Sequence, residues 1–558
     1  PGPAGPVNFN LARVSARTAL PEPVRVRFDG AQAGAWDAVG PGLTVGEGAN
    51  VFADVFFPRL TLLEVTDFHG ALLGGASDRS SGRPIGGAAT LAAYITRERA
   101  KNPTRTLLLD GGDWMQGTPI SNLNFGRPVI QFMNRNGVDA AAIGNHEFDW
   151  SVDTLRARMG EARFQPLGAN WVNRSDGKRA DGVAPWTILD RDGMRIGVIG
   201  LLTDETASVT LPKNVAAYRF PAGGPIARAL IDSCRAQGAD LVVVVGHLPG
   251  STDSTGTVKG ELADVARAVS GPDGAIAVLG GHSHNRLSGV VDGVPVIISG
   301  ALGQTLGRID FVIDRSTHRP IPEETRRQLL TTFADDVKPD PAIAAFVDSV
   351  NHDLLPITSR VLGRLSATLT RNRQGESPLG DWVADVMREA VGADFAFQNA
   401  GGLRADLEAG EVTMGDVYEV MPFDNQVATV TLTGAQVLGL VEHGVSPTNC
   451  VQLSGLSMVY DPDRPRGERV LEIRLPGGKR LDPGAKYKVA TNDFMAQGGD
   501  GFTMIAQGED LALPGVLVRD ALVKDVERRT RAGQSLVPAT PGRIVSRSAK
   551  PQPAGVAH

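Results

Sequence analysis

The sequence predicts a protein of two α/β domains. It has 558 residues, which is more than one hydrophobic core usually organises. From Leu60 onward, short apolar runs alternate with segments of helical spacing, a pattern typical of strand–helix–strand units around a buried sheet. Near residue 320 this pattern stops, and a block of different character begins near residue 361. We therefore expect one large domain, a connecting helix and a smaller second domain.

Composition excludes several classes of protein. Hydrophobic residues make up 42% and charged residues 21%, as in an ordinary globular protein. A net charge of -6 gives no basic footprint for a nucleic-acid polymer. The two cysteines, Cys234 and Cys450, are too few for a disulfide framework, and no apolar run reaches the roughly 18 residues of a membrane span. The expected partner is a small molecule, and the oligomeric state is left open.

The chain begins with an extension and continues into the first domain. Residues 1–58 mix Pro, Gly and short alternating pieces, and we assign them no chemistry. Residues 59–335 form the predicted first domain, because their apolar runs each have the length of one strand. The seven runs are Leu60–Val65, Thr106–Leu109, Val138–Ile143, Ile196–Gly200, Leu241–Val245, Ile276–Leu279 and Val294–Ile298.

A linker helix is predicted over residues 336–358. Asp340 followed by Pro341 is a typical helix start, and an apolar stripe continues to an end near Pro356. Such a stripe also suits an ordinary surface helix. Residues 359–548 form the predicted second domain, with a helix over Leu379–Val391 and a strand over Val427–Leu432. Residues 549–558 are predicted to be a disordered tail.

Polar side chains follow five of the predicted strands. In open α/β sheets, ligands bind at the carboxyl ends of the strands. A single His in such a place is more often a satisfied polar residue than a metal ligand, but a coincidence at five strand ends is hard to explain by chance. The seven candidate ligands are Asp67, His69, Asp113, Asn145, His247, His282 and His284.

Seven ligands are too many for one tetrahedral zinc, which takes four. Nitrogen and oxygen donors without a thiolate favour zinc, manganese or iron over calcium or magnesium. If one carboxylate bridges, the set divides between two metals roughly 3.5–4 Å apart, the arrangement of a two-metal hydrolase. We choose Asp113 as the bridge.

His146 remains after the ligands are assigned. Placed beside the metals and oriented by Asp149, it could contact phosphoryl oxygens or protonate a leaving oxygen. Asp149 could instead be a first-turn carboxylate favoured by the helix dipole.

The seven candidate ligands and His146, in this order along the chain, resemble the sequence motifs of the calcineurin-like metallophosphoesterases. Phe148-Asp149 after Asn145-His146-Glu147 is similar to the secreted 5′-nucleotidase branch, which includes bacterial UDP-sugar hydrolases. The resemblance implies a first domain that is a four-layer α/β/β/α sandwich, joined by the linker helix to a smaller α/β 5′-nucleotidase C-terminal domain. It also implies two divalent metal ions, manganese, zinc or similar, and a His146–Asp149 catalytic dyad. One metal would be held by Asp67, His69, Asp113 and His284, and the other by Asp113, Asn145, His247 and His282.

The second block resembles the same branch. Asn399 and Arg404 fall in a motif whose Arg reaches the phosphate and whose Asn contacts the base. Phe423 and Phe502 resemble the two rings that sandwich a nucleobase, although without the resemblance core packing would be the preferred reading. Arg371 and Arg373 fall where further phosphate-binding arginines are expected.

The resemblance implies a metal-dependent phosphoester hydrolase, a 5′-nucleotidase located in the periplasm, at the cell surface or outside the cell. Nucleotide diphosphates or UDP-sugars are further expected substrates. The alternatives are a 2′,3′-cyclic-nucleotide phosphodiesterase with 3′-nucleotidase activity and a non-catalytic nucleotide-binding surface protein. Asn145-His146-Glu147 argues against a sulfur-compound hydrolase of related fold. One departure from the family pattern is Trp150-Ser151, where a Gly often stands.

Overall fold

The computed structural model describes residues 58–548 except residues 79, 315, 316, 318, 540 and 541, together with the backbone of three strands before residue 58. These strands, β1 (Val24–Asp29), β2 (Gly34–Ala38) and β3 (Asn50–Ala53), form an antiparallel sheet in the order β2-β1-β3. The predicted disordered tail, residues 549–558, lies outside the described residues.

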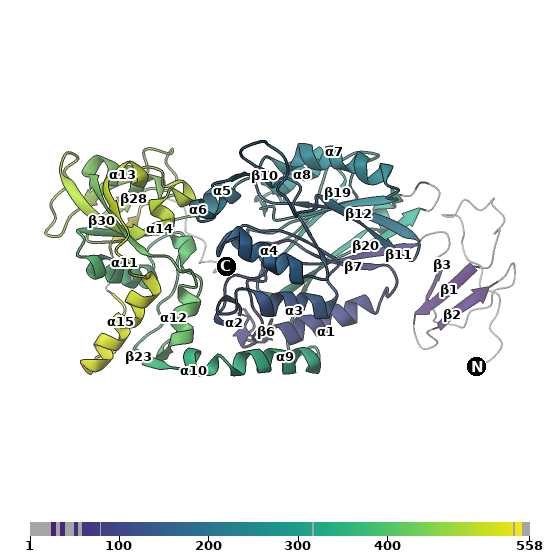
Figure 1. The fold of residues 1–558 in the computed structure, drawn as a ribbon, viewed down its shortest axis with the longest axis horizontal. Coiled ribbons are helices and arrows are strands. Elements are labelled where there is room, and N and C mark those ends of the chain that lie inside the picture. The colour runs from purple at the N-terminus through teal and green to yellow at the C-terminus, as the bar shows by residue number, and fades with distance from the viewer. Residues whose placement is uncertain are drawn as a thin grey trace.

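The first domain contains two large sheets (Figure 1). One has the order β21-β20-β4-β7-β8-β9 with β22 beside β20, and the other has the order β11-β12-β14-β17-β19-β18. The strands of the first sheet are β4 (Arg59–Val65), β7 (Thr106–Asp110), β8 (Ala140–Ala142), β9 (Gln165–Leu167), β20 (Thr305–Asp314), β21 (Arg319–Pro320) and β22 (Arg326–Thr331). Those of the second are β11 (Trp186–Arg191), β12 (Met194–Leu201), β14 (Leu241–Gly246), β17 (Ala277–Leu279), β18 (Arg286–Val291) and β19 (Val294–Ser299). All seven predicted runs contain a strand.

Helices cover the outer face of each sheet. Leu62 and Leu109 of the first sheet pack against Val198 and Val243 of the second, so a core lies between the sheets. Outside the first sheet lie α1 (Ala88–Arg99) and α3 (Arg127–Asn136), and outside the second lie α7 (Gly223–Ala236) and α8 (Glu261–Ala268). The four-layer α/β/β/α prediction is therefore confirmed.

Short elements line the edge where the parallel strands β4, β7, β8, β14 and β17 end. They are α2 (Pro119–Asn122), the 3₁₀ turn η2 (His146–Phe148), α4 (Val152–Glu161), α5 (Thr206–Val209) and α6 (Pro212–Val215). In Figure 1 α5 and α6 lie on the side of the second domain, and α5 contacts the second-domain turn η5 (Gly499–Gly501). This edge of the first domain therefore faces the second domain.

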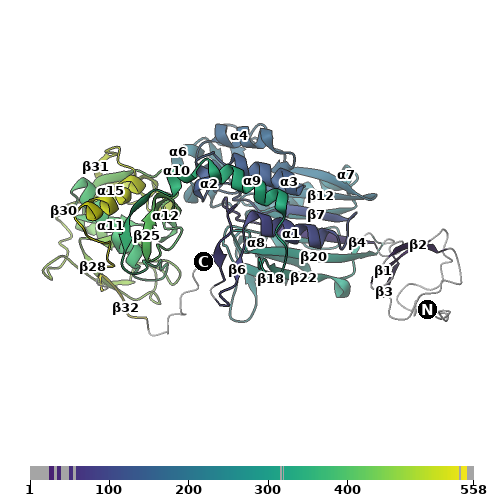
Figure 2. The same cartoon turned by 90° about the horizontal axis from the view of Figure 1, so that it is seen from below.

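The connecting helix α9 (Pro341–His352) packs against α1 and α3 of the first domain (Figure 2). As predicted, Asp340 caps it: the carboxylate accepts hydrogen bonds from Ala342 N at 2.9 Å and Ile343 N at 3.0 Å. The predicted end near Pro356 is wrong, because α9 ends at His352 and Pro356 lies in the first turn of α10 (Leu355–Thr358). A proline fits there because first-turn N–H groups need no partner within the helix.

The second domain is built on a sheet of order β27-β24-β30-β26-β31. Its strands are β24 (Phe395–Gln398), β26 (Val427–Thr433), β27 (Gln452–Ser454), β30 (Lys486–Asn492) and β31 (Glu509–Ala512). Smaller sheets pair β23 (Val361–Leu365) with β25 (Gly410–Thr413), and β28 (Ser457–Tyr460) with β29 (Val470–Arg474) and β32 (Ile544–Ser546). The helices are α11 (Pro378–Val391), α12 (Met414–Val420), α13 (Gly434–His443), α14 (Asp493–Ala496) and α15 (Val518–Arg531). The predicted helix at Leu379–Val391 and strand at Val427–Leu432 are confirmed as α11 and β26.

The buried clusters support two domains. Three clusters contain no core residue beyond Val347, and the other two contain none before Leu362. The exact boundaries at residues 59–335, 336–358 and 359–548 stay a prediction, and α9 packs as part of the first domain. Within the described part of the chain, no helix is long and apolar enough to cross a bilayer.

Candidate active site

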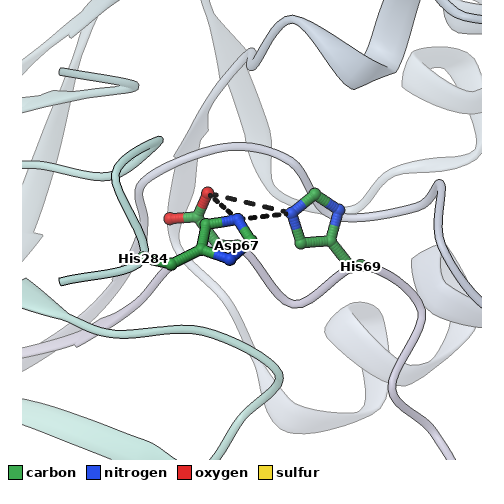
Figure 3. Close-up of side chains that lie close together, drawn as sticks. All are labelled: Asp67, His69 and His284. Carbon is green, nitrogen blue, oxygen red and sulfur yellow. Dashed lines mark hydrogen bonds and ion pairs between the residues drawn. The ribbon is translucent and has the colours of Figure 1, made fainter. Parts of the chain in front are cut away.

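Asp67, His69 and His284 bring three ligand atoms together at the ends of β4 and β17 (Figure 3). His69 Nε2 lies 3.0 Å from His284 Nε2, and His284 Nε2 lies 3.4 Å from Asp67 Oδ1. Two imidazole nitrogens and a carboxylate oxygen at these separations could bind one divalent metal.

Asp113, His247 and His282 form a second such group. His247 Nε2 lies 3.0 Å from Asp113 Oδ2 and 3.1 Å from His282 Nδ1. Asn145 Oδ1 is 3.1 Å from the same His247 nitrogen, so the amide oxygen joins this group. All seven predicted ligands therefore lie in two adjacent clusters.

Asp113 lies between the two groups. Its Oδ2 atom, 3.0 Å from His247 Nε2, is also 3.8 Å from His69 Nε2. A carboxylate within reach of both clusters is placed where a bridging ligand is needed.

The ligand loops have unusual backbone conformations. Five ligands have φ values in the left-handed region, namely Asp67 (50°), His69 (48°), Asp113 (57°), His282 (68°) and His284 (54°). Non-glycine residues in such conformations cost on the order of 1–3 kcal/mol each and cluster at functional sites. Gly144 permits the close approach of the loops, because a Cβ there would lie 2.2 Å from Asp113 Oδ1.

Hydrogen bonds from behind orient the imidazoles. His69 Nδ1 lies 2.8 Å from Gln116 O, and His247 Nδ1 lies 2.9 Å from Gly111 O. Each Nδ1 therefore donates its proton to the carbonyl, and each Nε2 faces the site. Burial is the main reason that the pKa of both His69 and His284 lies well below its usual range. The next contribution comes from the charge of Arg404 for His69, and from the neighbouring His69 ring for His284. Both rings are thus neutral, as metal ligands must be.

Glu147 supports the loops that carry the ligands. Its fully buried carboxylate accepts hydrogen bonds from Gly144 N at 2.8 Å, Asp113 N at 2.9 Å and Trp114 N at 2.8 Å. The sequence motif contains Glu147, but its supporting role emerges only from the structure, because Asp113 and Glu147 belong to different strand ends.

His146 lies beside the clusters and outside both. Its Nδ1 is 2.7 Å from Asp149 Oδ2, and its Nε2 is 4.0 Å from Asp113 Oδ2. Burial alone would lower the pKa of His146, but the Asp149 and Asp113 carboxylates outweigh it and raise the pKa above its ordinary value. Asn214 fixes the turn by donating to the carbonyls of Phe148 and Asp149. The predicted pair is thus in contact, with Nε2 directed at the site.

A cavity of about 730 Å³ joins these groups to the second domain, where Arg404 and Arg373 line it. Arg404 Nη2 lies 3.3 Å from His69 Nε2. Burial lowers the pKa of Arg404 to about 10, so the guanidinium remains charged at neutral pH. Arg371 is placed differently from the prediction: its guanidinium binds Asp406 Oδ1 at 3.0 Å and Arg404 O at 2.6 Å, outside the cavity lining.

The two predicted aromatic residues lie in different surroundings. Phe423 lines the cavity, and its ring stacks on His146 with centroids 5.7 Å apart. The prediction for Phe502 is contradicted, because its side chain is 1% exposed and packs in the second-domain core beside His443. Phe494, at the start of α14, lines the cavity instead. Gly499 lets the Phe494 ring lie against the backbone, since a Cβ there would come within 2.4 Å of it.

The cavity lining also includes Asp500 and Trp150, which the sequence did not single out as binding residues. Asp500 accepts a hydrogen bond at its Oδ2 from the predicted residue Asn399, at 2.8 Å, and both line the cavity. Asp500 has a φ of 52°, and its place in the Gly-rich segment was the available signal. Trp150, the departure noted in the sequence, also lines the cavity, with its ring edge-on to Phe125 at 5.8 Å.

Comparisons with known proteins agree with this architecture. The family model "Calcineurin-like phosphoesterase" matches residues 60–286, and "5'-nucleotidase, C-terminal domain" matches residues 357–507. The chain is 27% identical over 513 residues to protein UshA of Yersinia enterocolitica, covering 84% of this chain and 91% of that one. It is 26% identical over 422 residues to the endonuclease YhcR of Bacillus subtilis, covering 73% of this chain but only 34% of that longer protein.

A solved structure gives the same picture. The 5'-nucleotidase precursor from Thermus thermophilus superposes with a TM-score of 0.78 at 26% identity, covering 88% of this chain and 100% of that one. Both domains are thus accounted for by one family. The chain belongs to the calcineurin-like phosphoesterases that carry a 5′-nucleotidase C-terminal domain, which are metal-dependent phosphoester hydrolases.

Proposed function

We propose that the substrate is a nucleotide and that the chain acts as a 5′-nucleotidase, releasing phosphate from nucleoside 5′-phosphates. The observation that carries this proposal is the shared cavity. It connects the ligand clusters of the first domain with Arg404, Phe423 and Phe494 of the second. A charged phosphate end and an aromatic base end in one cavity match the two ends of a nucleotide.

The seven ligands fit two divalent ions, manganese, zinc or similar. Asp67, His69 and His284 would share one ion with Asp113, and the other ion would be held by Asp113 together with Asn145, His247 and His282. When bound, such a pair lowers the pKa of water and stabilises charge on a phosphoryl group.

The protein side chains bind and orient the substrate. The guanidinium groups of Arg404 and Arg373 match phosphate oxygens in geometry and charge. The rings of Phe423 and Phe494 would stack on the base, with Asn399 and Asp500 at the polar edge of the cavity. The arginines and the aromatic rings lie on the second domain, whereas the metal ligands lie on the first. Turnover therefore requires closure between the two domains.

His146 would donate a hydrogen bond, and finally a proton, to the leaving oxygen from Nε2. Asp149 holds Nδ1 at 2.7 Å, which fixes the ring orientation and favours the protonated form. A proton at Nε2 is required because an alkoxide is a poor leaving group.

Parallel assays of AMP, ADP, UDP-glucose and 2′,3′-cyclic AMP with Mn²⁺ test the proposal. AMP is expected to be hydrolysed efficiently, and ADP and UDP-glucose are further expected substrates. A preference for cyclic AMP would replace the proposal with a cyclic phosphodiesterase. Fewer than two bound metals together with no phosphatase activity would favour the non-catalytic alternative.

We also propose that the protein works outside the cytoplasm, as the family resemblance implies. Fractionation of the producing cell tests this, and recovery of the active protein in the cytoplasmic fraction would contradict it.

A further inference from the structure

Asn122 links the two domains through its side-chain amide. It is 4% exposed at the end of α2. Its Oδ1 accepts a hydrogen bond from Gly117 N at 2.9 Å, and its Nδ2 donates to Pro422 O at 3.0 Å. Gly117 belongs to the loop that follows Asp113, whereas Pro422 belongs to the second domain. One amide therefore connects the loop behind the proposed bridging ligand to the opposite wall of the cavity.

The Pro422 carbonyl bonds to the first domain, whereas the carbonyls of both its neighbours bond within the second. Arg519 Nη1 donates to Met421 O at 3.1 Å and to Phe423 O at 3.2 Å, both within the second domain. The carbonyls on either side of Pro422 therefore bind within the second domain, while Pro422 O itself accepts from Asn122 of the first domain.

The segment that Asn122 holds carries one substrate-binding group and anchors another. Val420 O accepts the hydrogen bond of Arg404 N at 3.0 Å, and Phe423 stacks on His146. Arg404 in turn reaches His69. Fixing this segment fixes the stacking ring and the guanidinium relative to the ligand clusters.

We propose that Asn122 is a positioning residue that stabilises the closed arrangement of the domains, in which Phe423 and Arg404 reach the metal ligands. The inference rests on the proposed nucleotide hydrolysis, since it assigns the amide a part in binding the nucleoside end of the substrate. A buried hydrogen bond of this kind corresponds to a change of about 2- to 10-fold in an equilibrium constant.

Asn122→Asp isolates the interdomain bond. The aspartate keeps an oxygen for Gly117 N but places a second oxygen against Pro422 O, which replaces attraction by repulsion. We expect kcat/KM for AMP to fall about 10-fold or more, mainly through KM. We also expect the loss for AMP to exceed the loss for p-nitrophenyl phosphate at least fivefold, because that ester has no nucleoside. Asn124→Asp is the matched control, since Asn124 Nδ2 bonds Ile120 O within its own turn at 3.2 Å.

A distance measurement tests the inference independently of activity. Spin labels on cysteines introduced at the exposed Lys178 and Lys479 report the interdomain distance, while Cys234 and Cys450 are 0% exposed and stay unlabelled. With zinc and a non-hydrolysable AMP phosphonate, Asn122→Asp should shift the distribution toward longer distances. Asn122→Ser, whose shorter side chain cannot span to Pro422 O, serves if the aspartate variant is unstable.

The possible failures can be told apart. A wild-type protein that hydrolyses no nucleotide contradicts the proposed function, and the distances still test Asn122. An unchanged distance distribution, whatever the kinetics, overturns the inference. Equal losses on AMP and p-nitrophenyl phosphate with loss of metal also overturn it, because the amide would then act only through the Gly117 loop.

Discussion

Replacing His146 by alanine separates proton donation from metal binding. The ring lies outside both ligand groups, with its Nε2 4.0 Å from Asp113 Oδ2, so its removal deletes no metal ligand. Its Nδ1 bond to Asp149, 2.7 Å long, indicates an oriented acid. General acid catalysis contributes about 10²- to 10⁴-fold, so kcat for AMP should fall by this factor. The corresponding increase in barrier is ~2.7–5.4 kcal/mol.

The assay compares AMP with p-nitrophenyl phosphate at matched metal content. A nitrophenolate leaves without needing a proton, whereas the ribose 5′-oxygen needs one. If His146 protonates the leaving oxygen, His146→Ala should reduce kcat at least tenfold more for AMP than for the nitrophenyl ester. Equal reductions would assign His146 to the phosphoryl oxygens instead. An unchanged kcat for AMP, or a variant that has lost its metals, would refute the dyad assignment.

Three further predictions test other parts of the account. Asp113→Ala should release both metals and abolish activity, as measured by elemental analysis and AMP hydrolysis; a variant that keeps two metals would contradict the bridging role. Phe494→Ala should raise KM for AMP roughly tenfold, since base stacking contributes about 1–3 kcal/mol. Phe502→Ala should leave KM unchanged and lower the unfolding free energy by ~3–5 kcal/mol in a denaturant titration. The reverse result would restore Phe502 as the stacking ring. Burial, opposed by Arg543 and assisted by Glu376 and Asp385, raises the pKa of Asp381 from 3.8 to about 7, so wild-type stability should be lost progressively as the pH rises between those values. Asp381→Asn should remove ~1–2 kcal/mol of that loss, and parallel pH profiles for the two proteins would contradict it.

The ligand set could be predicted because it follows from topology. Parallel strands of one sheet end at the same edge, so polar residues after β4, β7 and β8 lie together, as do those after β14 and β17 of the second sheet. The division of the strands between two sheets could not be derived from periodicity, because strands buried on both faces read as continuous apolar runs. The four-layer arrangement came from the family resemblance.

The substrate side was harder to predict, because small local choices decide which side chain enters the cavity. Phe494 and Phe502 flank the same glycine-rich turn, and the left-handed Asp500 directs the chain so that Phe502 packs inward. Arg371 and Arg373 are two residues apart, and partners distant in sequence, the Asp406 carboxylate and the Arg404 carbonyl, hold Arg371 outside the cavity lining. Asn122 has no local signal, since its partner Pro422 lies 300 residues away.

Titration of the metal-free protein with Mn²⁺, followed by the rate of AMP hydrolysis, tests the central claim most directly. Two ligand groups sharing Asp113 predict no activity without metal and full activity near two equivalents per chain. Activity that saturates at one equivalent, or AMP hydrolysis by the metal-free protein, would contradict a two-metal nucleotide hydrolase.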